Sequence, residues 1–539
     1  MRHRLSSLAA LLVCLAGGAH AALPTFWQVS TEAEFLRGDV ENLSIDSYGR
    51  LTLGPTATTV YESSAPFLWT VVSAPDGTLF VGSGNEGQVH RIDRTGKGSI
   101  FFDSDELEVH ALALAPDGGL YVGTSPNGKV YRVEPDGSSA VYFDPVDRYI
   151  WSLAVDRSGV LFVATGDRGV IYRVAPGGGG AVFYDTKATH VMTLAFDRDG
   201  RLLAGTGSPG RVFRIDASGR PFVLLDSSYS EIRMLRVDAG GNIYAAAVSG
   251  RQPGPDRPQP AAAPEPQQPP LTPTVSTEVT VVAIGDAAVS SGSQPPQQAP
   301  PARGPATGAL FRISPDGAWD LLWESREDTP YDIALEDDTR LLVATGNEGK
   351  IYRLAGDPSQ PTLVARATAQ QVTALLPGGD GRIVLATSNP GKLLRLSADR
   401  AERGIYLSDV RDAQTVATWG TIRWQAQVPA GTRVEISTRS GNTRTPDETW
   451  SDWSAPYTDP DGSPITSPRA RYLQWRAVFT GARGASPLLT SVTAAYLPRN
   501  MRPRVTGITI HPPGTIFQRP FPTEPEIAGF DGELPERRA

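Results

Sequence analysis

The sequence repeats with a period of 41 residues. Equivalent residues of the copies are Gly77, Gly118, Gly159, Gly200, Gly241, Thr339 and Gly381. The wider gap before Thr339 equals one period plus an insertion of 57 residues, so the chain holds seven copies. A fixed period near 40 residues is typical of proteins that repeat one supersecondary unit, such as propellers and solenoids.

Each copy contains four short apolar segments. In the second copy these are EVHALALA, GLYVGT, KVYRV and AVYFD. The turns between the second and third segments read NEG, PNG, DRG, SPG, NEG and NPG, and they end in glycine where a hairpin turn requires positive φ. Four antiparallel strands in about 40 residues match one propeller blade. A β-solenoid is the alternative, but its coils are usually shorter and its strands parallel. The sequence therefore predicts an all-β fold with a seven-bladed β-propeller at residues 57–405.

A repeated arginine marks the third strands, and an acid follows it by twelve residues in five copies. The arginines are Arg91, Arg132, Arg173, Arg214, Arg312, Arg353 and Arg395. We expect the arginine and the acid to form a cross-strand ion pair. In this pattern Arg353 has lost its acid, which is replaced by Ala365, and Arg395 meets Leu407.

Glu62 precedes the first full repeat, so it belongs to none of the seven copies. In other copies the acid lies seven residues before a fixed inner-strand position, and Glu62 stands in that relation to Trp69. We therefore predict that TTVYES, residues 58–63, is the outer strand of the last blade, pairs with residues 391–397 and closes the ring. ENLSIDSYGRLTLG, residues 41–54, resembles a further hairpin and leaves an eight-bladed ring as the alternative.

The pattern PDG-x-LYVGT…G-x-VYRV-x-PDG resembles the propellers of the broad NHL, SMP-30/gluconolactonase and YVTN group, over about residues 58–400. The resemblance implies the architecture only, because these motifs are the turns and strands of a blade. In that group, SMP-30-like lactonases are metal hydrolases with a Glu, Asn and Asp set at the pore. Virginiamycin B lyase-like propellers use a histidine with magnesium.

The ends of the chain and the insertion have their own composition. Residues 1–21 read as a signal peptide: basic MRHRLSS, the apolar run LAALLVCLAGG and the small-x-small cleavage pattern at Ala19-His20-Ala21. This predicts export to the periplasm or cell surface, with no transmembrane segment after cleavage. The signal holds Cys14, the only cysteine, so the mature chain has no disulfide and no Cys metal site. Because the net charge is −8, the sequence does not predict a protein that binds nucleic acid through general positive charge.

Three other segments fall outside the repeats. Residues 22–56 form an N-terminal segment, residues 250–307 a Pro- and Gln-rich insertion in the fifth copy, and residues 499–539 a Pro-rich tail that we expect to be disordered.

Residues 406–498 alternate like the strands of a β-sandwich and resemble fibronectin III or galactose-binding modules. Trp450-Ser451-Asp452-Trp453-Ser454 resembles the WSxWS box of cytokine-receptor modules, which implies that Arg433, Arg439 and Arg444 interleave with the tryptophans. Exposed tryptophans that stack on sugar rings are the alternative.

The candidate binding site is the mouth of the propeller pore. Equivalent inner-strand positions are Trp69, His110, Trp151, Met192, Arg233, Tyr331 and Gln371, and the residues two before them are Phe67, Glu108, Tyr149, His190, Glu231, Thr329 and Ala369. These positions vary although the rest of the repeat is uniform, so we predict ligand binding by Glu108, His110, Tyr149, Trp151, His190, Glu231, Arg233 and Tyr331.

No catalytic or metal-ligating residue is assigned. The sequence thus favours an exported, non-catalytic binding or scaffold protein that needs no cofactor and takes a protein or glycan partner. The alternative is a metal-dependent lactone hydrolase or lyase at the pore, which requires a divalent cation and uses His110 or His190 as a base. A third hypothesis is that the sandwich alone binds carbohydrate.

Overall fold

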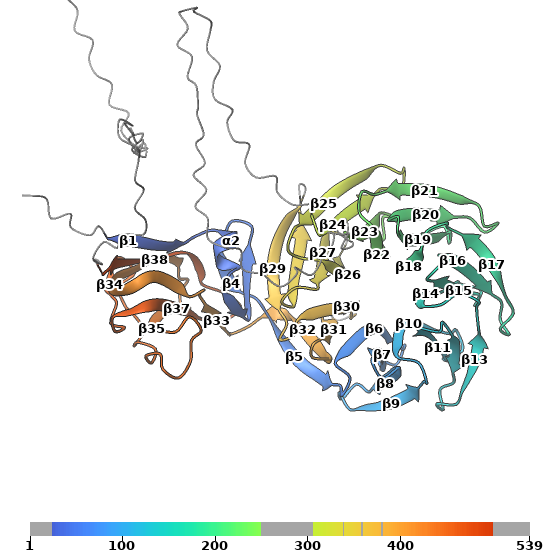
Figure 1. Cartoon of the computed structure of the whole chain (residues 1–539), viewed down its shortest axis with the longest axis horizontal. Helices are drawn as coiled ribbons and strands as arrows, with labels where there is room; N and C mark the ends of the chain where they lie inside the picture. Colours follow the sequence, from blue (N-terminus) through green and yellow to red (C-terminus); the bar gives the residue numbers. More distant parts are fainter. Residues whose placement is uncertain (1–23, 250–305, 338, 357–358, 379–380, 500–539) are drawn as a thin grey trace, which may run out of the picture. The chain divides into compact units, whose positions relative to one another are not determined.

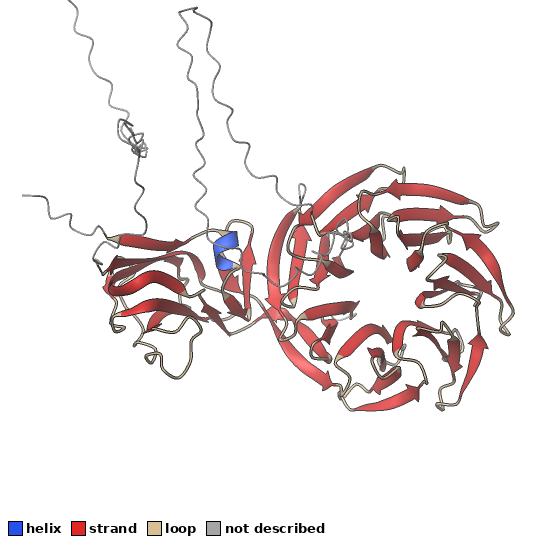
Figure 2. Cartoon of the chain, viewed as in Figure 1, coloured by secondary structure: helices blue, strands red, loops and turns tan. Residues whose placement is uncertain are grey.

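The computed structural model describes residues 24–249, 306–337, 339–356, 359–378 and 381–499. The helix within these ranges is the single turn α2 (Glu32–Phe35), and the rest is strand and loop (Figure 2). Nothing helical in this part of the chain has the length and apolar character needed to cross a membrane. The predicted signal peptide, nearly all of the insertion and the Pro-rich tail lie outside the described residues.

The repeats form four-stranded antiparallel blades, which confirms the propeller. The strands of the blades are, in order, β6 (Phe67–Ser73), β7 (Leu79–Gly84), β8 (Gln88–Ile92), β9 (Gly98–Asp103); β10 (Glu108–Leu114), β11 (Leu120–Ser125), β12 (Val130–Val133), β13 (Ser139–Phe143); β14 (Ile150–Val155), β15 (Leu161–Thr165), β16 (Val170–Val174), β17 (Gly180–Asp185); β18 (His190–Phe196), β19 (Leu202–Gly207), β20 (Arg211–Ile215), β21 (Pro221–Asp226); β22 (Glu231–Val237), β23 (Ile243–Val248), β24 (Gly308–Ile313), β25 (Trp319–Ser325); β26 (Pro330–Asp337), β27 (Arg340–Thr345), β28 (Lys350–Ala355), β29 (Gln360–Arg366); and β30 (Gln371–Pro377), β31 (Ile383–Ser388), β32 (Lys392–Arg400). Figure 1 shows the first strand of each blade at the centre of the ring and the fourth at its rim.

The chain closes the ring with a strand from before the first repeat. Strand β5 (Pro55–Glu62) pairs antiparallel with β32, with Thr58 opposite Arg395 and Glu62 opposite Lys392. The Lys392 Nζ lies 2.6 Å from the Glu62 Oε1. The predicted pairing of residues 58–63 with the last blade is therefore confirmed, and β5 covers an edge that β32 would otherwise expose.

The predicted ion pairs between repeated arginines and later acids are wrong. Ala140 lies opposite Arg132, and Phe222 lies opposite Arg214. A β-bulge between the third and fourth strands shifts the register, so the acid faces the residue three positions before the arginine. In this way Arg211 pairs with Asp226 at 2.9 Å.

Three of the repeated arginines reach acids on the other side, near the turn between the first and second strands, whereas Arg312 pairs with Asp320 of the fourth strand β25 at 3.0 Å. Arg132 pairs with Asp117, Arg214 with Asp197 at 3.3 Å, and Arg353 with Glu336 at 2.6 Å. Arg353, predicted to have lost its acid, therefore keeps a partner. The repeated pair is still structural, but it joins different strands from those expected.

The C-terminal strands form the predicted β-sandwich, with strands added from the N-terminal segment. Its strands are β33 (Arg403–Leu407), β34 (Arg411–Gln427), β35 (Arg433–Gly441), β36 (Ser463–Pro464), β37 (Ala470–Thr480) and β38 (Leu488–Pro498). Strand β34 pairs with β37 over its first residues and with β38 over the rest of its length, so it lies between these two strands in one sheet. From the N-terminal segment, β1 (Thr25–Val29) pairs with β38 and β2 (Asp39–Glu41) pairs with β33.

The remaining N-terminal strands do not form a further blade. Strands β3 (Leu43–Asp46) and β4 (Leu51–Leu53) make the predicted hairpin of residues 41–54. Thr362 of β29 lies opposite Asp46, so β3 extends the outer edge of an existing blade. Leu51 of β4 lies opposite Leu489 of β38. Hydrogen-bonded pairing thus runs from the sandwich through the hairpin to the propeller.

The tryptophans of the WSDWS segment stack with arginines. The Arg439 guanidinium lies 4.6 Å from the ring centroid of Trp453 and 5.5 Å from that of Trp450, and Arg476 lies 4.7 Å from Trp453. The second stacking arginine is therefore Arg476 of β37, which the motif did not suggest. Arg433 is instead directed to Glu435, at 3.5 Å, and Arg444 has no cation–π contact among those found in the described residues.

Candidate functional site at the pore mouth

A β-bulge at the start of every inner strand sets the geometry of the pore mouth. In β6 the ladder skips from Leu68 to Thr70, and in β10 it skips from Val109 to Ala111. The skipped residues of the blades are Trp69, His110, Trp151, Met192, Arg233, Tyr331 and Thr373. A bulged residue leaves the pairing ladder, and bulges commonly re-aim side chains beside functional sites.

The bulge corrects one predicted equivalence. The residue of β30 that corresponds to Trp69 is Thr373, and Gln371 corresponds to the residue two before. Thr373 is buried, and its hydroxyl donates hydrogen bonds to the Leu68 and Ala386 carbonyls. This position therefore ties the last inner strand to the first and does not line the pore mouth.

Aromatic side chains from successive inner strands contact one another in a continuous series. Trp69 stacks on Phe67 (ring centroids 5.4 Å apart, planes 5° apart) and on His110 (5.3 Å, 29°). The His110 ring lies 4.9 Å from that of Trp151, which stacks on Tyr149 at 5.6 Å and 10°. We call Phe67, Trp69, His110, Tyr149 and Trp151 the aromatic arc. All five side chains are half-buried, so a ligand can reach their rings.

Charged side chains flank the aromatic arc. The Glu108 Oε2 accepts a hydrogen bond of 2.7 Å from the His110 Nε2, and this bond lowers the pKa of Glu108. Farther around the ring the Arg233 Nε donates to the Glu231 Oε1 at 2.7 Å, and the Arg233 guanidinium lies 4.7 Å from the Tyr331 ring centroid. The Glu108 carboxylate thus lies beside the aromatic arc, whereas Glu231 and Arg233 belong to β22, two blades farther around the ring.

The tautomer of His190 follows from its partner. The Trp151 Nε1 donates to the His190 Nδ1 at 3.3 Å. An indole nitrogen can only donate, so the His190 Nδ1 carries no proton and the neutral ring holds its proton on Nε2. The two rings meet edge to face at 88°, which fixes the orientation of Trp151.

The predicted residues therefore fall into two groups. Hydrogen bonds and ring contacts link the members of each group to one another. The first group is Glu108, His110, Tyr149, Trp151 and His190, and the second is Glu231, Arg233 and Tyr331. Within the described residues, no group of three or more His, Cys, Asp or Glu side chains is arranged to hold a metal ion.

Glycines of the second strands make room for the large rings. A Cβ on Gly84 would lie 2.4 Å from the Trp69 Nε1, and a Cβ on Gly346 would lie 2.1 Å from the Tyr331 Cε2. Each of these glycines follows its aromatic residue at the same offset in the repeat, as Gly166 follows Trp151. In these three copies the glycine therefore accompanies a Trp or Tyr at the inner-strand position, and this pairing in the sequence predicts that the large ring packs over the glycine.

Replacing Gly166 by alanine is expected to displace Trp151. The new Cβ would lie 2.8 Å from the Trp151 Nε1 and 3.0 Å from both the His190 Nδ1 and the Tyr149 Cβ. We expect a loss of about 1–3 kcal/mol in the free energy of unfolding from overpacking, and a shifted tryptophan emission spectrum. Gly179→Ala is the matched control, because a Cβ there meets nothing within 4 Å. Equal effects of the two substitutions would contradict this packing.

Comparison with known proteins found similarity among solved structures only. No protein-family model and no curated protein matches the sequence. Among solved structures the chain is similar to a streptogramin B lyase (13% identity, 64% of this chain and 98% of that chain covered, TM-score 0.48). It is also similar to virginiamycin B lyase from Staphylococcus aureus (12%, 65% and 98%, TM-score 0.47) and to YCF48 bound to D1 peptide (11%, 64% and 96%, TM-score 0.44).

Proposed function

We propose that this chain is a binding protein that holds its partner at the pore mouth of the propeller. The aromatic arc carries the proposal: stacked rings from three inner strands, half-exposed, with the Glu108 carboxylate bonded to one of them. The Glu108 and His110 side chains are 33% and 17% exposed, so their polar atoms are also accessible. Flat aromatic faces next to hydrogen-bonding groups suit a ligand with an apolar face and hydroxyl groups.

A glycan is the partner that best fits this combination. Sugar rings present C–H faces to aromatic rings and hydroxyls to carboxylate and guanidinium groups. A protein partner that inserts an apolar side chain is the alternative. We also propose that the protein acts after export, on the strength of the signal-like sequence of residues 1–21.

A second candidate function rests on the Glu108–His110 pair. A carboxylate hydrogen-bonded to an imidazole is an arrangement that orients a general base. This favours proton abstraction at the pore mouth, as a lactone hydrolase or lyase would require. The two functions can be told apart by experiment. The enzyme would require a divalent cation and would convert its substrate, whereas the binding protein would do neither.

The test is a thermal-shift and titration screen of the full chain against neutral and acidic oligosaccharides, lactones and divalent ions, each with and without chelator. A ligand that binds the native state raises the melting temperature, and the rise grows with the logarithm of its concentration once it exceeds the Kd. Binding of an oligosaccharide without a metal requirement supports the proposal. Turnover of a lactone that chelator abolishes supports the enzyme instead.

Replacing Trp151 by alanine is expected to weaken binding of the ligand found in this screen at least tenfold. Aromatic anchors at the centre of a site commonly contribute about 2 kcal/mol or more. Isothermal titration measures the change. The matched control is Trp319→Ala, because Trp319 is an exposed tryptophan of the outer strand β25. If both variants bind like the unaltered protein, the pore mouth is not the site.

A further inference from the structure

One ring contact recurs where neighbouring blades meet. The outer strand of one blade places an aromatic ring against a ring of the third strand of the next blade, 29 residues later in the sequence. The ring centroids of these pairs lie between 5.1 and 5.9 Å apart. The pairs are Tyr61–His90, Phe102–Tyr131, Phe143–Tyr172, Tyr184–Phe213 and Trp323–Tyr352.

The first of these pairs differs from the others, because it contains a histidine. In the third strands of the other blades the equivalent residues are Tyr131, Tyr172, Phe213, Phe311, Tyr352 and Leu394. Of this series, His90 alone can gain a positive charge near neutral pH. It lies where the ring closes, because Tyr61 belongs to the closing strand β5 of the last blade and His90 to β8 of the first blade.

His90 connects the closing segment to the first blade. Its side chain is buried, at 1% exposed. The Tyr61 hydroxyl lies 3.1 Å from the His90 Nδ1, and the Ser63 hydroxyl lies 3.3 Å from the Nε2. The Tyr61 ring is also packed against β9, because a Cβ on Gly98 would collide with it. Both nitrogens of one imidazole are therefore engaged by the segment that closes the ring.

The surroundings of His90 favour the neutral ring. The two hydroxyls carry no charge, although each can accept from an imidazolium as well as donate to a neutral ring. Val81 and Ile100 lie opposite His90 in the neighbouring strands β7 and β9. Burial lowers the pKa of His90, and the Glu86 carboxylate, from the turn between β7 and β8, opposes this only in part. Burial also raises the pKa of Tyr61, so the facing hydroxyl stays neutral as well.

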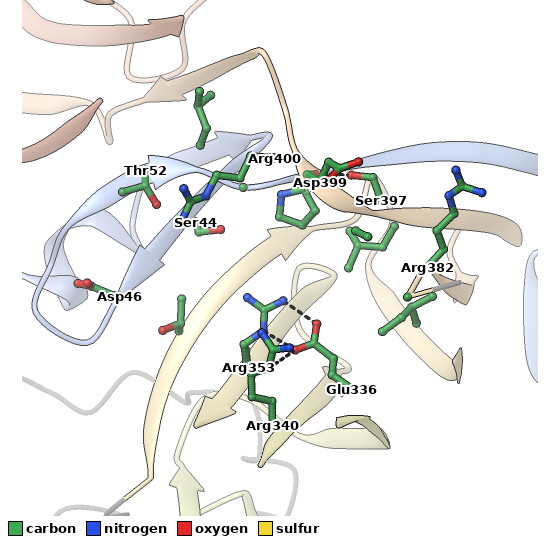
Figure 3. A pocket seen from close by; sticks show the side chains of 18 of the residues that line it. Ser44, Asp46, Thr52, Glu336, Arg340, Arg353, Arg382, Ser397, Asp399 and Arg400 are labelled. Atoms are coloured by element: carbon green, nitrogen blue, oxygen red, sulfur yellow. Dashed lines mark hydrogen bonds and ion pairs between the residues drawn. The ribbon is translucent and has the colours of Figure 1, made fainter. Parts of the chain in front are cut away.

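A charge at this joint would lack the partner that half-buried charges have elsewhere in the ring. Figure 3 shows Arg353 of β28 donating to both oxygens of Glu336, at 2.6 Å each. Within the described residues no ion pair of this kind reaches the His90 imidazole. A charge removed from water without a partner is unfavourable. Protonation of His90 therefore favours an arrangement in which water reaches the ring.

We propose that the joint between the last and the first blade is a pH-sensitive latch, which is closed while His90 is neutral and loosens when His90 gains a proton. The latch consists of Tyr61, Ser63 and His90. The other joints have Tyr, Phe or Leu at the position of His90 and stay closed over the same pH range. The closing segment leads directly into β6, which carries Phe67 and Trp69 of the aromatic arc. A loosened latch would therefore also disturb the pore mouth.

Hydrogen–deuterium exchange of the full chain at about pH 7.5 and about pH 5.5 tests the latch. Strands β13 and β16, which carry Phe143 and Tyr172 of an equivalent joint, are the reference in the same sample, so the effect of pH on the intrinsic exchange rate cancels. At the lower pH we expect β5 and β8 to lose up to about tenfold more protection than the reference, because His90 in the open joint binds a proton with its usual pKa of 6.5. Equal losses at the two joints overturn the proposal.

The matched variant is His90→Tyr, because tyrosine stands at this position in three other blades. We expect the excess loss of protection in β5 and β8 to disappear in this variant. An excess that persists would belong to other titrating groups and would overturn the proposal. Should His90→Tyr not fold, His90→Gln decides in the same way, because glutamine keeps hydrogen-bonding groups and cannot gain a charge.

Discussion

Replacing Trp475 by alanine is expected to cost about 3–5 kcal/mol of folding free energy, the largest effect of any single substitution considered for this protein. Trp475 is 1% exposed and lies at the centre of the sandwich. Its ring centroid is 5.0 Å from that of Tyr406, which in turn contacts Phe35 edge to face at 5.5 Å. The Tyr406 hydroxyl donates to the Phe35 carbonyl at 3.0 Å. The cavity left by the substitution would therefore loosen the N-terminal helix as well as the sandwich.

Chemical denaturation and limited proteolysis measure these two consequences. We expect a lower denaturation midpoint and faster cleavage near residues 30–41. Trp475→Phe keeps most of the buried area and should cost distinctly less. An unchanged cleavage rate with a destabilised sandwich would show that the N-terminal segment is held by its strand pairing alone.

Replacing Asp332 by alanine is expected to cost about 3 kcal/mol of folding free energy. Asp332 is 2% exposed, in the inner strand β26. Its carboxylate accepts from the Arg236 guanidinium of β22 at 2.8 Å and from the Leu375 N–H of β30 at 2.8 Å. The substitution would leave a buried N–H and a partly buried guanidinium without acceptors. One side chain therefore joins three neighbouring inner strands.

The substitution Asp332→Asn removes the negative charge but keeps an oxygen that accepts hydrogen bonds, so it separates these two contributions to stability. Burial raises the pKa of Asp332, against the opposing effect of Arg236 and of the Leu375 and Ile333 N–H groups. Because the folded pKa lies above the usual 3.8, the folded state binds this proton more tightly, and this contribution to stability falls as pH rises above 3.8. Unfolding curves at several pH values should show that stability rises less, or falls more, with increasing pH in the unaltered protein than in Asp332→Asn. The same slope in both would contradict the burial of this carboxyl.

The sequence period predicted the blades because each copy must satisfy the same turns and bury the same apolar strands. The closing strand was also predictable, since Glu62 has the spacing of an outer-strand acid. The ion-pair partners were not, because a spacing of twelve residues does not show where the turn between two strands lies, and that turn places Phe222, not Asp226, opposite Arg214. Gln371 was a different error, because the spacing of eight residues from Trp69 to Gly77 already selects Thr373 before Gly381.

Contacts between distant segments were the least predictable part. Arg476 stacks on Trp453 only because β35 and β37 pair, which no local motif records. The pore-mouth residues were accessible to sequence analysis because they occupy one register of a regular repeat.

The most direct test of the proposed pore-mouth site is hydrogen–deuterium exchange of the full chain with and without the ligand found in the screen. Our account predicts slower exchange at the starts of the inner strands β6, β10 and β14, where the aromatic arc lies, and no change in residues 433–467 of the sandwich. Protection confined to residues 433–467 would contradict it and assign binding to the WSDWS region of the sandwich.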